Sequence, residues 1–244
     1  MALVFAMMSK IFFLILMMMM VVVTIVTGAK NTNNVYDPCS DTKIQKQDGF
    51  TFGIAFSSKE SFFFNDTALS PCDRRLSLST ASNNPQLSLF RPKVDEISLL
   101  TINASSSSSF PDNQRGYMVA FAGRKYAARS SPTFVANSTY TITSFTMVLE
   151  FQKGTLQNFH WKRDGCASCS GKSSFVCLDK QDCAIRTSSC KDHGGSVDCS
   201  LGIQLAFSGT DKHDDVLNSW YEVANLRQYS LYGLYSNLKN SLTS

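Results

Sequence analysis

Six of the eight cysteines lie between Cys166 and Cys199, and this cluster constrains the fold more than any other feature of the chain. The cluster contains Cys166, Cys169, Cys177, Cys183, Cys190 and Cys199, and the remaining two cysteines are Cys39 and Cys72. An even number of cysteines in an exported protein indicates a disulfide framework, because the compartment is oxidising. We expect three bridges inside the cluster and a fourth between Cys39 and Cys72. A bridge from either of these two into the cluster is the alternative.

The first 29 residues predict export. Lys10 is the only charge before an apolar run at 11–27, and Thr27-Gly28-Ala29 supplies the small residues of a cleavage site. This order is typical of a secretory signal peptide. The alternative is an uncleaved membrane anchor at 11–27, although the run is shorter than the roughly 20 residues that a spanning helix needs. We therefore predict a signal peptide at 1–29 and a single secreted domain at 30–244. Retention of 11–27 would instead keep the protein in the endomembrane system.

The charge balance argues against a nucleic-acid partner. The chain carries 23 Lys and Arg against 19 Asp and Glu, a formal net charge of +4, without a long basic block. Nucleic-acid-binding domains usually gather Lys and Arg on one face or in one stretch. The small basic spot at 124–129 is most simply a solvated loop, and its other interpretation is an attraction to acidic polysaccharide. The candidate ligand contacts are Arg124, Lys125 and Arg129 for an acidic glycan, and Trp161 or Trp220 for stacking on a sugar.

Apolar residues recur at every second position in several short segments. The clearest are 50–56, 145–151 and 203–207, with no helical periodicity between them. A period of two indicates a strand with one buried face. We predict an all-β fold, an antiparallel β-sandwich or a jelly-roll-like domain, to which 166–199 is attached as a disulfide-rich loop segment.

Two further segments bear on this prediction. Phe62-Phe63-Phe64 is interpreted as a short buried strand, with an exposed aromatic edge as the alternative. Leucine and tyrosine at helical spacing predict a short amphipathic C-terminal helix at 229–242.

The cysteine cluster contains two motifs that resemble chemical sites. Cys166-Ala167-Ser168-Cys169 has the spacing of a redox dithiol, but Gly165 before it and Ser170-Gly171 after it favour a loop over a helix start. A zinc site needs a second closely spaced pair, which the later cysteines do not provide. Gly171-Lys172-Ser173 lacks the earlier glycine of a phosphate-binding loop, because Cys166 occupies that position. We predict structural disulfides and neither a metal nor a cofactor.

A catalytic centre is not evident. The densest acidic stretch, 211–215, is most simply a solvated loop after a strand. The alternative is a glycan-active hydrolase that uses carboxylates between 211 and 222, with Asp214, Asp215 and Glu222 as candidates. Such an enzyme needs two carboxyl groups facing one cleft at about 5–9 Å.

Three Asn-X-Ser/Thr sequences, at Asn65, Asn103 and Asn137, lie between strand signals. N-glycosylation there is plausible in an exported chain.

Six segments of the chain together resemble a land-plant family of secreted, cysteine-containing "expressed proteins" of unassigned function. They are Tyr36-Asp37-Pro38-Cys39, Gly49–Ser57, Gly116–Ser130, Trp161–Gly171, Gln181–Cys190 and Ser219–Leu238. The resemblance implies a plant cell-wall or endomembrane location and transfers no catalytic residue. We therefore expect a non-enzymatic extracellular module that binds cell-wall polysaccharide or a protein partner.

Overall fold

The computed structural model describes residue 10 and residues 31–76, 86–102, 116–124, 128–163, 165–169 and 174–226. The chain divides into two compact units, Met1–Asn31 and Thr32–Ser244, and the second contains all the elements below. Apart from Lys10, the predicted signal peptide lies outside the described residues, as does the predicted helix at 229–242. Within the described ranges, no helix has the length and apolar character needed to cross a membrane.

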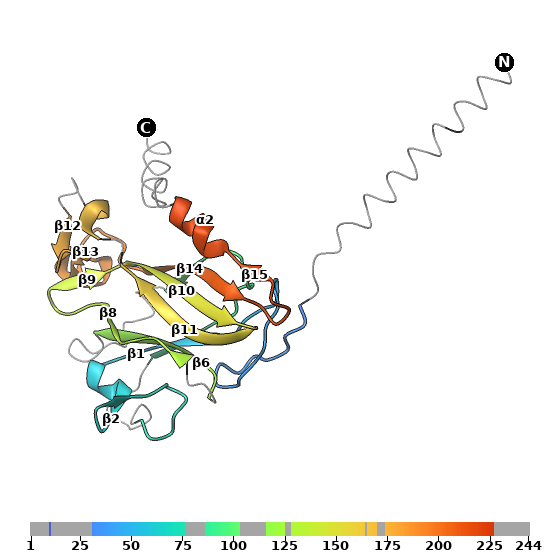
Figure 1. Ribbon diagram of the computed structural model, residues 1–244. Helices are drawn as coiled ribbons and strands as arrows, with labels where there is room; N and C mark the ends of the chain where they lie inside the picture. Colours follow the sequence, from blue (N-terminus) through green and yellow to red (C-terminus); the bar gives the residue numbers. More distant parts are fainter. Residues whose placement is uncertain are drawn as a thin grey trace, which may run out of the picture. The chain divides into compact units, whose positions relative to one another are not determined.

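Two five-stranded sheets form the domain (Figure 1). The first has the order β4 (Gln86–Phe90), β1 (Phe52–Ser57), β6 (Tyr117–Ala122) and β7 (Ala128–Arg129), and β8 (Thr133–Phe134) also pairs with β6. The second has the order β11 (Thr155–Lys162), β10 (Ser144–Gln152), β14 (Leu201–Thr210) and β15 (Val216–Leu217), and β5 (Ser98–Ile102) pairs with β14. The all-β sandwich prediction is confirmed.

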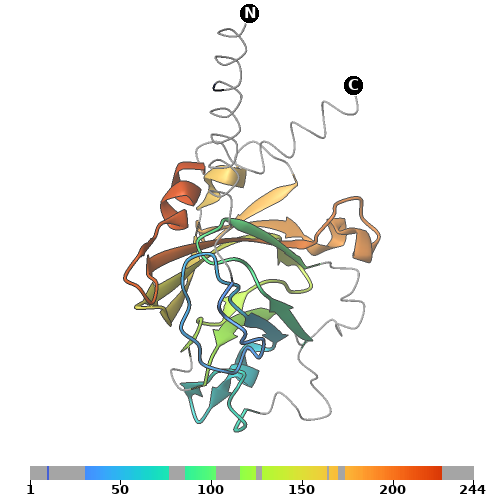
Figure 2. The same ribbon diagram turned by 90° about the vertical axis from the view of Figure 1, so that its right-hand side faces the viewer.

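The core between the sheets follows directly from the period-two pattern. Phe52 and Ile54 of β1 pack in one buried cluster with Leu149 of β10 and Phe207 of β14. Aromatic rings make many of these contacts, since Phe151 stacks on Phe207 with the ring centroids 6.1 Å apart. The turned view in Figure 2 agrees with Figure 1 that the two sheets lie over one another.

One pairing departs from the predicted antiparallel arrangement. Strands β10 and β14 run parallel, with Ser144 opposite Gly202 and Phe151 opposite Gly209. The reason is topological. The hairpin partner β11 returns the chain to the end where β10 begins, because Lys162 lies opposite Thr146. The cysteine-rich segment connects the strands at that end, so β14 starts beside the start of β10.

The cysteine-rich segment contains more regular structure than a loop. Strands β12 (Phe175–Leu178), β13 (Asp182–Arg186) and β9 (Tyr140–Ile142) form a third sheet. Short 3-10 helices, η4 (Cys166–Cys169), η5 (Thr187–Ser189) and η6 (Lys191–His193), surround this sheet. The prediction of a loop segment is therefore corrected here: the segment contains the β12–β13 hairpin, in which Cys177 lies opposite Cys183.

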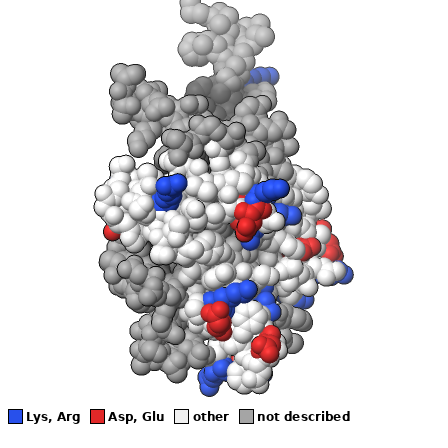
Figure 3. All heavy atoms as spheres, turned by 90° about the vertical axis from the view of Figure 1, so that its left-hand side faces the viewer, with Lys and Arg blue, Asp and Glu red and all other residues white. Residues whose placement is uncertain are grey.

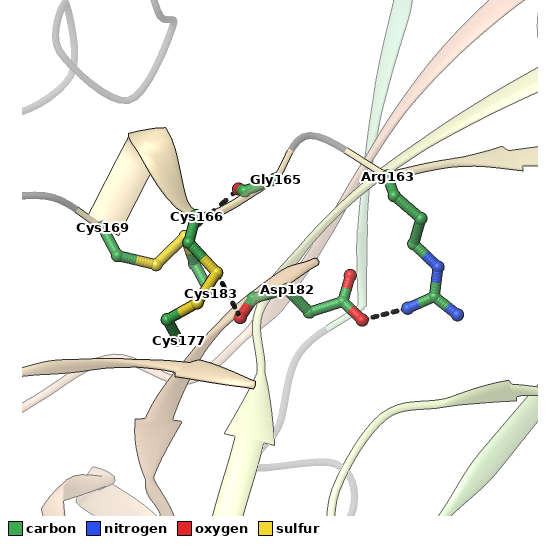
Figure 4. The surroundings of a disulfide bond; sticks show 7 residues. All are labelled: Arg163, Gly165, Cys166, Cys169, Cys177, Asp182 and Cys183. Carbon is green, nitrogen blue, oxygen red and sulfur yellow. Dashed lines mark hydrogen bonds and ion pairs between the residues drawn. A yellow bond between two sulfur atoms is a disulfide. The ribbon is translucent and has the colours of Figure 1, made fainter. Parts of the chain in front are cut away.

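All eight cysteines are paired, as predicted, with three bridges inside the cluster and one outside it. The pairs are Cys166–Cys177, Cys169–Cys183, Cys190–Cys199 and Cys39–Cys72. In Figure 4 two of these bridges join η4 to the hairpin, and the ion pair between Arg163 and Asp182 lies beside them. Four disulfides indicate that the protein folds in an oxidising compartment.

Two short helices and a small hairpin complete the described chain. The 3-10 helix η1 (Lys59–Phe62) leads into a hairpin of β2 (Phe63–Phe64) and β3 (Thr67–Ala68). The helix α2 (Ser219–Leu226) packs on β14. The phenylalanine run is divided between environments, since Phe62 is buried and Phe64 is 40% exposed. The prediction of a single buried strand is therefore wrong, because the buried Phe62 ends η1 and the strand begins only at Phe63.

Candidate functional site

A hollow of about 690 Å³ lies between the segment 68–75 and the strands β7 and β11. Four arginines line it together with one aspartate, and we call it the arginine hollow. Its lining consists of Ala68, Leu69, Ser70, Cys72, Asp73, Arg74, Arg75, Arg124, Ala128, Arg129 and Gln157. A volume of this size falls within the range of about 300–1,000 Å³ that is usual for small-ligand sites.

Arg129 is the most enclosed of the four arginines. It lies on β7 opposite Phe121, and its Nε donates a hydrogen bond of 2.9 Å to the carbonyl oxygen of Ala68. Burial lowers the pKa of Arg129 from its usual value, yet an arginine in protein stays protonated. The bond to Nε restricts the orientation of the guanidinium and leaves its two terminal nitrogens outside this hydrogen bond.

Arg124 is positioned through its backbone. Gly123, which precedes it, has φ +75° and donates its N–H to the Pro38 carbonyl at 2.7 Å. A Cβ at Gly123 would lie 2.3 Å from an oxygen of Asp41, and that same oxygen accepts the N–H of Arg124 at 3.0 Å. The turn therefore requires glycine, and it directs an exposed Arg124 side chain to the rim.

Arg75 and Asp73 form a two-point ion pair. The Nε and Nη2 atoms of Arg75 donate to the two carboxylate oxygens of Asp73 at 3.0 and 2.8 Å. These side-chain bonds, together with the backbone N–H of Arg75, lower the pKa of Asp73 to about 2. One carboxylate therefore offsets one of the four guanidinium groups, and the lining of the hollow has a clear excess of positive charge.

This excess is local. On the face shown in Figure 3, basic and acidic side chains are interspersed and form no continuous basic field. The formal net charge of +4 is likewise small for 244 residues. The gathering of arginines therefore depends on how the fold arranges a few side chains.

The structure places the predicted ligand contacts in different regions. Arg124 and Arg129 both line the arginine hollow, whereas Lys125 lies outside the described residues. The sequence does not indicate Arg74 or Arg75, whose one signal is their position just after Cys72. Nearness to Cys72 helps to place these two arginines in the fold only when the disulfide partner of Cys72 is known.

The two tryptophans lie elsewhere. Trp161 on β11 packs edge-on against Phe145, with the centroids 5.7 Å apart, and contacts the main core. Its buried Nε1 has no hydrogen-bond partner within the described ranges. Trp220 on α2 lies under the ammonium of Lys162, which is 5.1 Å from the ring centroid. Neither ring lines the arginine hollow, and a role in sugar stacking stays a prediction for both.

The acidic stretch after β14 is organised around Asp211, which is only 1% exposed. One carboxylate oxygen accepts the N–H groups of His213 and Asp215, and the other accepts that of Lys46. Burial raises the pKa of Asp211, but the three backbone bonds outweigh it and the pKa is lowered overall. Both oxygens are used to hold the turn.

The other candidate carboxylates, Asp214, Asp215 and Glu222, are exposed, and none of them lines the arginine hollow. Within the described ranges, no group of three or more His, Cys, Asp or Glu side chains has the geometry of a metal site.

Two of the three glycosylation candidates lie on exposed turns, and Asn103 falls outside the described residues. Asn65 and Asp66 form the tip of the β2–β3 hairpin, with φ angles of +46° and +62°. The Oδ1 of Asn137 accepts the N–H groups of Thr139 and Tyr140, both at 2.8 Å, in an Asx turn.

A family model described as "Uncharacterised protein DDB_G0273449" matches residues 8–242. The chain belongs to this family. No curated protein and no solved structure matches the chain significantly. The family match spans every residue of the arginine hollow, and the resemblance to land-plant secreted proteins stays an expectation.

Proposed function

We propose that the protein is an exported binding module that takes an acidic glycan into the arginine hollow. The observation that carries the proposal is that four arginines line one hollow with a single acidic residue, Asp73, among them. The planar guanidinium matches carboxylate and sulfate oxygens with two parallel hydrogen bonds, so this lining selects an anion.

The state of the arginines supports an anionic ligand. Only Arg75 is paired with Asp73, while the side chains of Arg74 and Arg124 make no ion pair within the described ranges. Arg129 is half-buried, and its charge is held there at a cost in solvation. A ligand carboxylate would offset that cost, because a desolvated charge gains most from an opposite charge at contact distance.

The extracellular setting narrows the class of anion. Four disulfides require an oxidising compartment, and the predicted signal peptide at 1–29 would deliver the chain to it. The resemblance to plant secreted proteins points to the cell wall, whose acidic polysaccharides carry uronic-acid carboxylates. We therefore take an oligogalacturonide as the ligand to test first.

Calorimetry with protein recovered from secreting cells tests the proposal. Removing one ligand-bound arginine, as in Arg124→Ala or Arg74→Ala, is expected to weaken oligogalacturonide binding about tenfold. The matched control is Arg186→Ala, which removes the same charge from an exposed position on β13 outside the hollow. Equal affinities for the hollow variants and the control would place binding elsewhere. A wild-type protein that binds no acidic glycan would overturn the proposal.

A further inference from the structure

An exposed aromatic ring lies beside the arginine hollow. Phe64 on β2 is 40% exposed, and the Cζ atom of Arg75 lies 5.7 Å from the centroid of its ring. Arg75 in turn lines the hollow and is clamped by Asp73. The guanidinium of Arg75 thus stands between an anion-binding surface and an apolar ring.

The hairpin fixes the position of this ring. Phe63 packs against the smaller buried cluster that contains Phe62 and Phe121, and the alternation along the strand turns Phe64 outward. Phe64 lies opposite Thr67, and Asn65 and Asp66 between them both have positive φ, as a tight two-residue hairpin turn requires. The ring is therefore presented by a short ordered hairpin.

The same hairpin also builds the hollow. Its last residue, Ala68, lines the hollow and accepts the hydrogen bond from Nε of Arg129. The ring of Phe64 and the donors of Arg129 are consequently connected through one rigid element.

We propose that the arginine hollow and Phe64 form a single two-part site for a uronic-acid sugar. The arginines bind the carboxylate, and the ring of Phe64 packs against the apolar C–H face of the pyranose. This inference rests on the proposed function and narrows it, because a site with an aromatic platform distinguishes a sugar acid from an inorganic polyanion. Aromatic rings supply large contact area with little loss of side-chain freedom, which suits the recognition of a ring-shaped ligand.

Two probes separate the parts of the site: a short oligogalacturonide and inorganic tripolyphosphate. Phe64→Ala is expected to weaken oligogalacturonide binding about five- to tenfold, while tripolyphosphate binding stays within about twofold. Phe64→Tyr and Phe64→Trp should keep the wild-type affinity for the sugar. Phe64→Leu, which keeps an apolar side chain but lacks the ring, should lose affinity as Phe64→Ala does. Thermal melts of each variant verify that the fold is retained. Tyr221→Ala, which removes an aromatic ring that is 66% exposed on α2, is the matched control and should change neither affinity.

The outcomes distinguish this inference from the proposed function. Loss of sugar binding in Arg124→Ala with no loss in Phe64→Ala would overturn the role of Phe64 and leave the arginine hollow in place. An equal loss of both probes in Phe64→Ala would show that the ring only supports Arg75, and would also overturn the inference. Absence of sugar binding by the wild-type protein would overturn both proposals.

Discussion

The disulfide between Cys39 and Cys72 joins a segment that lines the arginine hollow to a segment that holds the turn before Arg124. Cys72 lines the hollow and lies two residues before Arg74. Cys39 lies next to Pro38, whose carbonyl accepts the N–H of Gly123 just before Arg124. The loop of Arg74 is thus connected to the turn before Arg124 through one disulfide and one backbone hydrogen bond.

Removing this bridge is expected to reduce both the stability of the fold and the affinity for the ligand. The double variant Cys39→Ser/Cys72→Ser should lose about 2–4 kcal/mol of unfolding free energy, because the bridge closes a loop between residues that are 33 apart. Its binding of oligogalacturonide at a temperature where it stays folded should fall about tenfold or more, as two arginine-bearing segments lose their common anchor. Denaturant unfolding and calorimetry measure the two effects.

The control for that experiment is Cys190→Ser/Cys199→Ser, which removes a bridge in the cysteine-rich segment. The separation there is only 9 residues, so the expected loss of stability is smaller, and binding should be unchanged. If the two double variants lost binding equally, the Cys39–Cys72 bridge would have no special relation to the hollow.

A second prediction concerns Gly53, over which the ring of Phe121 lies. A Cβ at Gly53 would come within 2.3 Å of Cζ of Phe121, and that ring is only 1% exposed. Gly53→Ala should therefore destabilise the protein by about 1–3 kcal/mol, since a well-packed ring must move. The double variant Gly53→Ala/Phe121→Leu should recover part of the loss relative to the sum of the single variants. Strictly additive losses in a double-mutant cycle would contradict the contact.

The strands were accessible from the sequence because their signal is local. The predicted segment 50–56 overlaps β1, and 145–151 and 203–207 lie within β10 and β14. Burial of one sheet face imposes this alternation on the chain itself. The parallel pairing of β10 and β14 was not accessible in this way. The direction of pairing depends on the end of the sheet to which the chain returns. The residues within the two strands do not determine that end.

The residues of the candidate site also fall into those that local sequence indicates and those that only long-range contacts bring together. Arg124 and Arg129 attract attention because they are close together in the sequence. Arg74 and Arg75 join them through the Cys39–Cys72 pairing and the sheet order, which are long-range facts. The phenylalanine run shows the same limit, since burial of Phe62 and exposure of Phe64 follow from the end of η1 and the start of a hairpin two residues apart.

The pKa of Asp211 leads to a prediction on pH. Its pKa is lowered in the folded state, so the carboxylate contributes stability above its unfolded pKa of about 3.9. That contribution is lost as the pH falls from this value through the lower folded pKa. Asp211→Asn should lower the free energy of unfolding by about 1–3 kcal/mol at pH 7. The NH2 group of asparagine would replace an oxygen that accepts backbone N–H groups, so two donors would face each other.

Urea unfolding of wild type and Asp211→Asn between pH 7 and pH 2 measures this effect. The gap in stability between the two proteins should be constant at neutral pH and should narrow only in the acid range. Asp214→Asn, at an exposed position in the same turn, is the control and should show little effect at any pH. A gap that did not narrow in acid would mean that the charge of Asp211 is unimportant to the turn.

The last prediction concerns Asp95, which caps a helix far away in the sequence. Its Oδ1 accepts the N–H groups of Asn218 and Ser219 at 2.7 and 2.9 Å, at the start of α2, and its Oδ2 lies 2.7 Å from Nζ of Lys46. The Asp95 side chain is 1% exposed, whereas the Lys46 side chain is 45% exposed, so the carboxylate itself is shielded from water. Asp95→Ala leaves the N–H groups and the ammonium without their acceptor and should cost about 1–3 kcal/mol.

The loss should be concentrated in α2, because the N–H groups that Asp95 accepts lie at the start of this helix. Amide hydrogen exchange should therefore accelerate in 218–226 of Asp95→Ala, while exchange in β10 and β14 rises only as far as the global loss of stability requires. Lys46→Met removes the ammonium but keeps both backbone bonds, so it should accelerate exchange in α2 much less. Equal acceleration in the two variants would assign the stability of α2 to the ion pair rather than to the cap.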